Sequence, residues 1–153
     1  MGKIAFVFSG QGDQFSGMGK ELSERFETAR SVFSLCDSVR PGTSEQCFAG
    51  SDEELKMTVN TQPCLFAFEL AVAETLRANG IVPDMVAGFS LGEVAACTFA
   101  GVFDCRTGFS LVCKRAELMQ EASEKVNASM AAVVKLNEDT VRRICSEFNG
   151  VYP

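Results

Sequence analysis

A pentapeptide of the pattern G-x-S-x-G, Gly88-Phe89-Ser90-Leu91-Gly92, separates a short apolar run from a stretch of small residues. The run 81–87 predicts a strand whose start Pro83 delays to about Met85, and residues 91–100 predict a helix. A serine held in a sharp turn between strand and helix is the arrangement of a nucleophile elbow. The alternative is an ordinary glycine-rich turn with an incidental serine.

The rest of the chain alternates between strand and helix patterns. Lys3–Phe8 predicts a buried strand, and residues 127–136 predict a third one after 81–87. Helices are expected at 17–30, 52–57, 61–79, 91–100, 106–123 and 138–148, whereas 37–51 lack periodicity and are expected to form a loop. Strands that alternate with helices pair in parallel, so the predicted fold class is α/β.

The helix expected at 61–79 has the clearest boundaries. Asn60 or Thr61 is a suitable N-cap, Pro63 lies near the first turn, and Gly80 follows the end. Its body, Cys64–Leu76, is apolar on almost every face, apart from Glu69, Glu74 and Thr75. Such a helix is expected deep in a core.

Composition narrows the class of protein. The length of 153 residues is about one domain, and the net charge of −6 argues against nucleic acid and anionic membrane surfaces as partners. The longest uncharged stretch, Met57–Phe68, is far shorter than the ~20 residues that span a bilayer. Seven scattered cysteines without a C-x-x-C pair predict reduced thiols in a cytoplasmic protein, with no disulfide framework and no metal site.

The chain contains no histidine. Histidine is the side chain that most often acts as general base near neutral pH. Any chemistry of the Ser–His type at Ser90 therefore needs a histidine from outside these residues.

The loop Gly10-Gln11-Gly12-Asp13-Gln14 follows the first predicted strand. The next glycine is Gly17, so the loop does not fit the dinucleotide pattern G-x-G-x-x-G, and it has no lysine for a P-loop. The loop either offers backbone N–H groups and amide side chains to a polar ligand or is a tight turn between strand and helix.

Arg115 is the one charge on the expected inward face of the helix 106–123. That face, by helical spacing, comprises residues 108, 111, 112, 115, 118, 119 and 122. An unpaired guanidinium would be costly there, so Arg115 needs an anion. Either Glu93 or the carboxylate of a ligand supplies it.

Together these features resemble the N-terminal part of the malonyl-CoA:acyl-carrier-protein transacylase family. The matching segments are Gly10–Gln14, Thr61-Gln62-Pro63, Gly88-x-Ser90-Leu91-Gly92-Glu93, Arg115, Ala100–Phe103 and Met119–Ala122. The resemblance covers essentially the whole chain. It implies an α/β-hydrolase-like parallel-sheet core over residues 1–125 and the start of a small ferredoxin-like subdomain over 126–153.

The resemblance also implies roles for individual residues. Ser90 would be the acyl-accepting nucleophile, and Gln11 and Leu91 would supply oxyanion-hole N–H groups. Arg115 would bind the free carboxylate of malonyl in a bidentate manner. Further residues of the pocket would be Gln62, Phe89 and Glu93.

The implied reaction is a ping-pong transfer of malonyl from coenzyme A to the phosphopantetheine of an acyl carrier protein in fatty-acid synthesis. Both thioesters are substrates, and no cofactor is implied. Two departures stand out: Phe89 occupies the place where the family usually has histidine, and the catalytic histidine of the family would lie beyond Pro153. The chain is therefore expected to be truncated and impaired by itself. The alternatives are a serine hydrolase or thioesterase, and a non-catalytic fragment that binds an acyl carrier.

Overall fold

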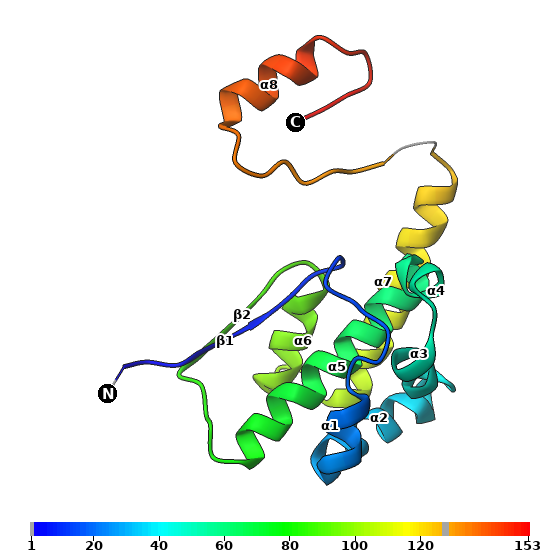
Figure 1. Cartoon of the computed structure of the whole chain (residues 1–153), viewed down its shortest axis with the longest axis vertical. Helices are drawn as coiled ribbons and strands as arrows, with labels where there is room; N and C mark the ends of the chain where they lie inside the picture. The colour runs from blue at the N-terminus through cyan, green and yellow to red at the C-terminus, as the bar shows by residue number, and fades with distance from the viewer. Residues whose placement is uncertain (1, 127–128) are drawn as a thin grey trace.

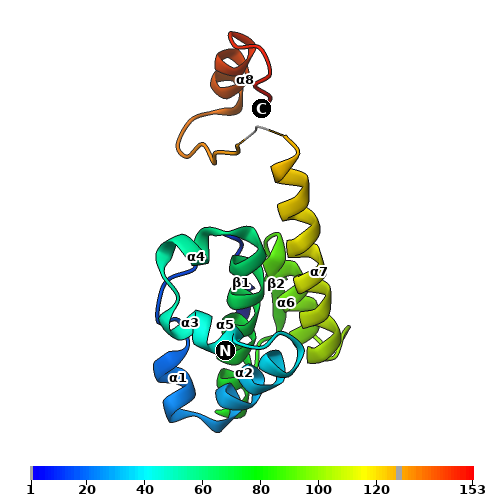
Figure 2. The same cartoon turned by 90° about the vertical axis from the view of Figure 1, so that its right-hand side faces the viewer.

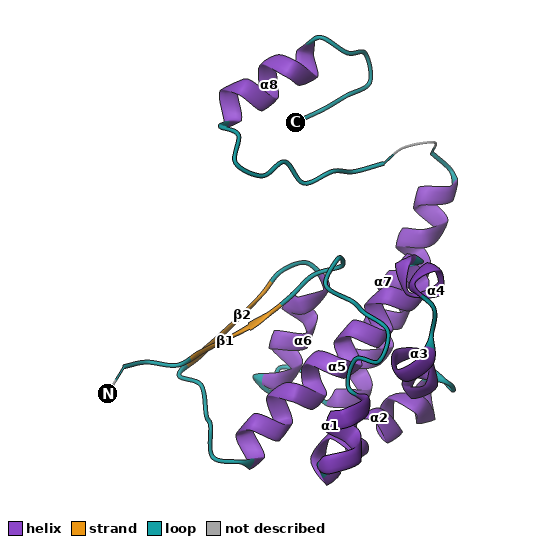
Figure 3. Cartoon of the chain, viewed as in Figure 1, coloured by secondary structure: helices purple, strands orange, loops and turns teal. Residues whose placement is uncertain are grey.

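The computed structural model describes residues 2–126 and 129–153. Strands β1 (Ala5–Phe8) and β2 (Met85–Gly88) pair in parallel, with Ala5 opposite Met85 and Phe8 opposite Gly88. The helices are α1 (Lys20–Arg25), α2 (Glu27–Val39), α3 (Thr43–Ala49), α4 (Asp52–Lys56), α5 (Thr58–Ala78), α6 (Leu91–Phe99), α7 (Cys105–Glu124) and α8 (Glu138–Ser146) (Figures 1 and 3). The parallel sheet confirms the predicted α/β class.

Helix α5 is the centre of the fold. It packs against α2, α3, α4, α6 and α7, while α6 also covers both strands. Phe66 of α5 and Phe109 of α7 are both fully buried, with ring centroids 5.8 Å apart. The nearly uniform apolar composition of α5 is explained by this position, because neighbours cover it on several sides.

The start of α5 differs from the prediction. The helix begins at Thr58 after Met57, so Asn60 and Thr61 lie inside its first turn instead of capping it. The amide of Asn60 and the hydroxyl of Thr61 donate to the carbonyls of Glu54 and Leu55. These polar side chains join α5 to α4, which is a tertiary role that resembles a capping signal in the sequence.

The prediction of a loop at 37–51 is wrong. Helix α2 continues to Val39, and α3 follows after Gly42, whose φ of 82° suits glycine. Contacts with the core hold this short helix, since Thr43 and Cys47 are fully buried. Its stability comes from packing. A helix of seven residues is too short to show a clear hydrophobic periodicity in the sequence.

The strands themselves are more exposed than predicted. Only Phe8 of β1 is buried, and Val7 is 78% exposed. The third strand expected at 127–136 is wrong for 129–136, which have no strand pairing, and its first two residues lie outside the described part of the chain. A strand needs a neighbour for its backbone hydrogen bonds, and the described residues bring none alongside this segment.

The buried face of α7 is rotated from the predicted one. Its buried residues are Gly108, Phe109, Val112 and Ala116. The apolar side chains of Leu111, Leu118 and Met119 lie instead at the surface, in an open groove of about 450 Å³ that extends from Leu111 to Ala122. Spacing alone could not separate the two stripes, because both are apolar.

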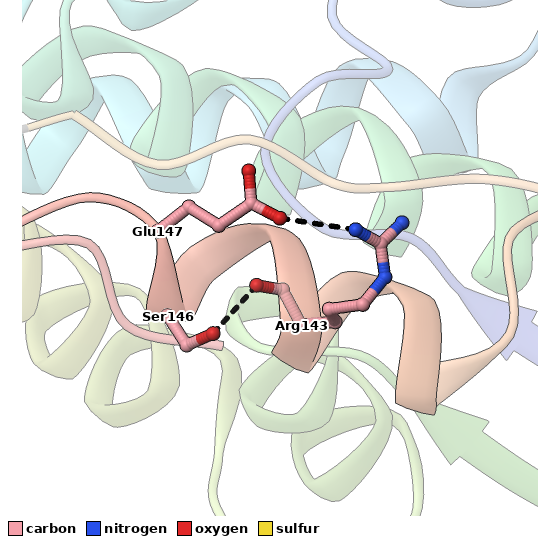
Figure 4. A network of polar contacts seen from close by, with 3 residues as sticks. All are labelled: Arg143, Ser146 and Glu147. Carbon is pink, nitrogen blue, oxygen red and sulfur yellow. Dashed lines mark hydrogen bonds and ion pairs between the residues drawn. The ribbon is translucent and has the colours of Figure 1, made fainter.

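Helix α8 lies apart from the main body in both views (Figures 1 and 2). Its polar contacts are local: Arg143 donates to Glu147 at 3.0 Å, and the hydroxyl of Ser146 donates to the Arg143 carbonyl (Figure 4). Among the described residues, no helix has the length and apolar character needed to cross a bilayer.

Candidate active site

Ser90 occupies the turn from β2 into α6 with an unusual backbone conformation. Its φ of 56° and ψ of −112° lie outside the regions that L-residues favour, and Lys135 is the one other described non-glycine residue with positive φ. Ser90 is exposed, whereas Leu91 after it is fully buried and begins α6. The strained, exposed serine confirms the sharp strand-to-helix turn predicted from G-x-S-x-G.

Glycines allow the turn to lie directly against the end of β1. A Cβ on Gly92 would come within 2.2 Å of the Ser9 carbonyl oxygen, and one on Gly88 would come within 2.1 Å of the Gly92 oxygen. The backbone N–H of Phe89 donates to the Phe8 carbonyl at 3.0 Å across this contact. Both glycines are therefore required for close backbone packing.

We expect Gly92→Ala to destabilise the fold by about 1–3 kcal/mol, because the added methyl group meets backbone atoms that cannot move aside cheaply. The free energy of unfolding in urea measures the loss. Gly2→Ala is the control, since a Cβ there meets no atom within 4 Å. Equal stability of the two variants would show that the turn does not rest on β1 in solution.

Arg115 reaches Ser90 from α7. Its Nη2 donates to the Ser90 Oγ at 2.9 Å, and its Nη1 donates to the Gln62 Oε1 at 2.6 Å. Gln62 is 1% exposed, and its own amide nitrogen lies 3.2 Å from the Met119 sulfur. The guanidinium is thus held by a buried amide, and three of its five N–H donors remain for another acceptor.

Glu93 does not pair with Arg115. It is exposed at the first turn of α6, and no ion pair of Arg115 occurs among residues 2–126 and 129–153. The sequence left either Glu93 or a ligand carboxylate as the anion for Arg115, and Glu93 does not take this role in the structure. A half-buried guanidinium without an anion is a suitable partner for an anionic ligand.

The loop after β1 lies beside the turn that holds Ser90. The ring of Phe89, 74% exposed, packs over Gly10, where a Cβ would lie 2.6 Å from the ring. The side-chain amide of Gln11 donates to the Thr58 Oγ1 at 3.2 Å. In the part of the chain that the structure describes, the backbone N–H groups of Gln11 and Leu91 make no backbone hydrogen bond.

Glu69 is a residue that the sequence analysis did not assign to the site. Its Oε1 accepts hydrogen bonds from both the backbone N–H and the hydroxyl of Ser9, the residue that follows β1. Its Oε2 is buried without a partner in the described structure. Burial raises the pKa of Glu69 to about 7, and the nearby carboxylate of Asp13 adds a smaller effect in the same direction.

One side of α5 thus contacts three parts of the site. Thr58 binds Gln11, Gln62 binds Arg115, and Glu69 binds Ser9. The spacings of four and seven residues place all three polar side chains on one stripe of the helix. A signal was present in the sequence, because Glu69 is a charge in the middle of the apolar stretch Cys64–Ala73 of this helix.

The side chains that could ligate a metal ion do not cluster in the described residues. No group of three or more histidine, cysteine, aspartate or glutamate side chains within the described ranges could hold a metal ion. The seven cysteines are free thiols, and Cys36, Cys47 and Cys64 are buried.

Comparison with known proteins adds to this geometry. The acyl transferase domain family matches the chain over residues 5–153. The malonyl CoA-acyl carrier protein transacylase of Bacillus subtilis (strain 168) is 40% identical over 145 residues, which is 94% of this chain and 46% of that protein. The chain spans about half the length of the curated relatives it matches.

Solved structures agree with this result. The malonyl-CoA:ACP transacylase of Synechocystis sp. PCC 6803 superposes with a TM-score of 0.84 at 38% identity, over 97% of this chain and 49% of that one. A malonyl-transacylase in complex with a type II PKS acyl-carrier protein superposes with a TM-score of 0.82 at 32% identity, over 95% and 48%. The match to the family extends over nearly all of the sequence and includes the turn around Ser90, so this chain belongs to the acyl transferase domain family.

Proposed function

We propose that this chain is the N-terminal part of a malonyl-CoA:acyl-carrier-protein S-malonyltransferase. In the first half-reaction the Ser90 Oγ attacks the thioester carbonyl carbon, the C–S bond breaks, and coenzyme A leaves as the thiol. In the second, the phosphopantetheine sulfur attacks the ester carbonyl, the C–O bond breaks, and Ser90 regains its proton. The N–H groups of Gln11 and Leu91 stabilise the oxyanion in both steps.

One observation supports the malonyl substrate above others. Arg115 lies 2.9 Å from the Ser90 Oγ, is oriented by the buried Gln62, and has no carboxylate partner in the described structure. A guanidinium with free N–H donors beside a nucleophile suits an acyl group that carries its own carboxylate. An acetyl group would leave this positive charge unpaired.

We expect Arg115→Ala to change the preference for the acyl group. Loss of a charge-assisted hydrogen bond costs about 1.5–3 kcal/mol, so kcat/KM for malonyl-CoA should fall about 10- to 150-fold, while that for acetyl-CoA changes little. The measurement uses a full-length form, meaning this chain followed by the second half that its relatives have. Arg106→Ala, also on α7 but bonded to Ser38, is the matched control.

Equal losses of both activities in Arg115→Ala would make Arg115 a structural residue. The assay also separates transfer from hydrolysis. Release of free malonate at the same rate with and without the carrier protein would favour a hydrolase, since a transferase needs the thiol acceptor for turnover.

Substrates, partner and domain organisation follow from the same family. Coenzyme A and phosphopantetheine thioesters are the substrates, the acyl carrier protein is the partner, and no cofactor takes part. Residues 1–125 form the α/β-hydrolase-like core, and 126–153 begin a small ferredoxin-like subdomain, which is supported by the separation of α8 from the body (Figure 1). Seven free thiols support a cytoplasmic, reducing environment.

A further inference from the structure

We propose that Glu69 is a positioning residue. Through Ser9 it holds the loop after β1, which contains Gln11, against the turn that contains Ser90. This inference rests on the proposed acyl transfer for its catalytic consequence, but its structural part is independent of the substrate. Neither the resemblance nor the comparisons assign a role to this glutamate.

The contact is between a helix and the first residue after a strand. The Glu69 Oε1 accepts from the Ser9 Oγ at 2.7 Å and also from the Ser9 backbone N–H. The carbonyl of the same Ser9 faces Gly92, the second residue after the nucleophile. Ser9 is therefore held by α5 on one side and lies against the Ser90 turn on the other.

The loop has a second attachment to α5 two residues later. The Gln11 side chain donates to Thr58, about 16 Å along the helix axis from Glu69 at 1.5 Å per residue. The two attachments lie on either side of Gly10, over which Phe89 packs. The Gln11 N–H is thus placed by the Ser9 contact two residues before it and by the contact of its own side chain, and loss of the Ser9 contact releases one of the two.

The surroundings explain why a carboxyl group is unusual at this position. Glu69 lines an apolar groove of about 370 Å³ between β1 and α5, in which Asp13 is the one other titratable group among the described lining residues. Its Oε2 is buried and has no hydrogen-bond partner in the described structure. A buried carboxyl that served packing alone would be replaced without loss by an apolar side chain, so its double contact with Ser9 is the function we assign to it.

The test uses the full-length form with Glu69→Ala, Glu69→Gln and, as the matched control on the same helix, Glu74→Ala. Glutamine keeps an acceptor oxygen for Ser9, whereas alanine removes the acceptor of the half-buried Ser9 N–H. We expect Glu69→Ala to lower kcat about 10- to 100-fold, with KM for malonyl-CoA changed less than about threefold, and Glu69→Gln to restore most of kcat. Glu74 pairs with Arg77, so Glu74→Ala should leave both constants unchanged.

A readout that does not need activity completes the test. Amide hydrogen exchange in the peptide that contains Ser9 and Gln11 should accelerate in Glu69→Ala but not in Glu69→Gln or Glu74→Ala. Unchanged exchange in Glu69→Ala, or full kcat in that variant, overturns the proposal. If the unsubstituted protein transfers no malonyl, the proposed function fails while exchange still decides the positioning role. Should Glu69→Ala not fold, Ser9→Ala removes the 2.7 Å bond alone and should give a smaller loss of kcat.

The raised pKa of Glu69 predicts a pH dependence of stability. Because the folded state holds the proton up to about pH 7 and the unfolded state loses it near the ordinary value of 4.5, stability falls as pH rises between these values. Glu69→Gln should remove this component. The unfolding free energy of Glu69→Gln minus that of the unsubstituted protein should therefore increase from pH 5 to pH 8. A constant difference would contradict the burial of Glu69.

Discussion

Residues 1–153 alone are expected to transfer malonyl at least about a hundredfold more slowly than the full-length form. The chain has no histidine, and the described hydrogen bond of the Ser90 hydroxyl comes from Arg115, a donor that cannot accept its proton. Positioned general-base catalysis contributes typically ~10²–10⁴-fold. The expected deficit is therefore mainly in the formation of the acyl-serine.

The surface of the chain supports the same expectation. Parallel sheets are normally covered on both faces, but Val7 and Met85 of the two-stranded sheet are 78% and 50% exposed. On α7, Leu118 is 53% exposed in the groove beside Arg115. Open strand edges and apolar grooves favour association, so we expect the isolated chain to aggregate or to pair with another chain.

The experiment compares the isolated chain with the full-length form. Light scattering after size-exclusion chromatography reports the association state. Transfer of malonyl to the carrier protein, measured at equal molar concentrations of the two proteins, reports activity. Full activity from a monomeric 153-residue chain would contradict the need for a base from outside these residues.

Ser90→Ala is expected to abolish malonyl transfer by the full-length form, because alanine has no oxygen to accept the acyl group. The fold should be retained, since the Ser90 side chain is exposed and bonds to Arg115 alone in the described structure. We expect no rate above the uncatalysed exchange of malonyl between thiols.

A second substitution separates chemistry from conformation. Ser90→Gly also removes the hydroxyl, but glycine adopts a φ of 56° without steric cost, so its unfolding free energy should be no lower than that of Ser90→Ala. Ser110→Ala, which removes a hydroxyl bonded to the Arg106 carbonyl, is the control and should keep full activity. Appreciable transfer by Ser90→Ala would move the nucleophile elsewhere, for example to a cysteine.

The sequence predicted most of the elements that position the site. The delayed strand at Met85, the turn at Ser90 and the long apolar helix were all confirmed, because each has a strong local signal: a proline, a glycine-rich turn and continuous apolar character. Helix α3 was missed because its stability depends on burial of Thr43 and Cys47. The strand at 127–136 was predicted wrongly because its apolar pattern needs pairing that the described residues do not provide.

The site was predictable where a charged residue interrupts an apolar helix face. An arginine among apolar residues of one helix indicated a partner outside that helix, and the structure brings it to Ser90 and Gln62. Glu69 was not predicted as a site residue, since its partner Ser9 is sixty positions away and sequence contains no measure of that proximity. Long-range contacts of this kind depend on how α5 lies beside β1, with which it lines one groove.

The site at which malonyl becomes attached to the protein decides whether Ser90 is the acyl acceptor. The full-length form is incubated with malonyl-CoA without carrier protein, digested under mildly acidic conditions, and analysed by mass spectrometry. We expect one malonyl group on the peptide that contains Ser90, and its removal when the carrier protein's phosphopantetheine thiol is added. Malonyl on a cysteine-containing peptide without Ser90, or transfer without any acyl-enzyme, would contradict this role of Ser90.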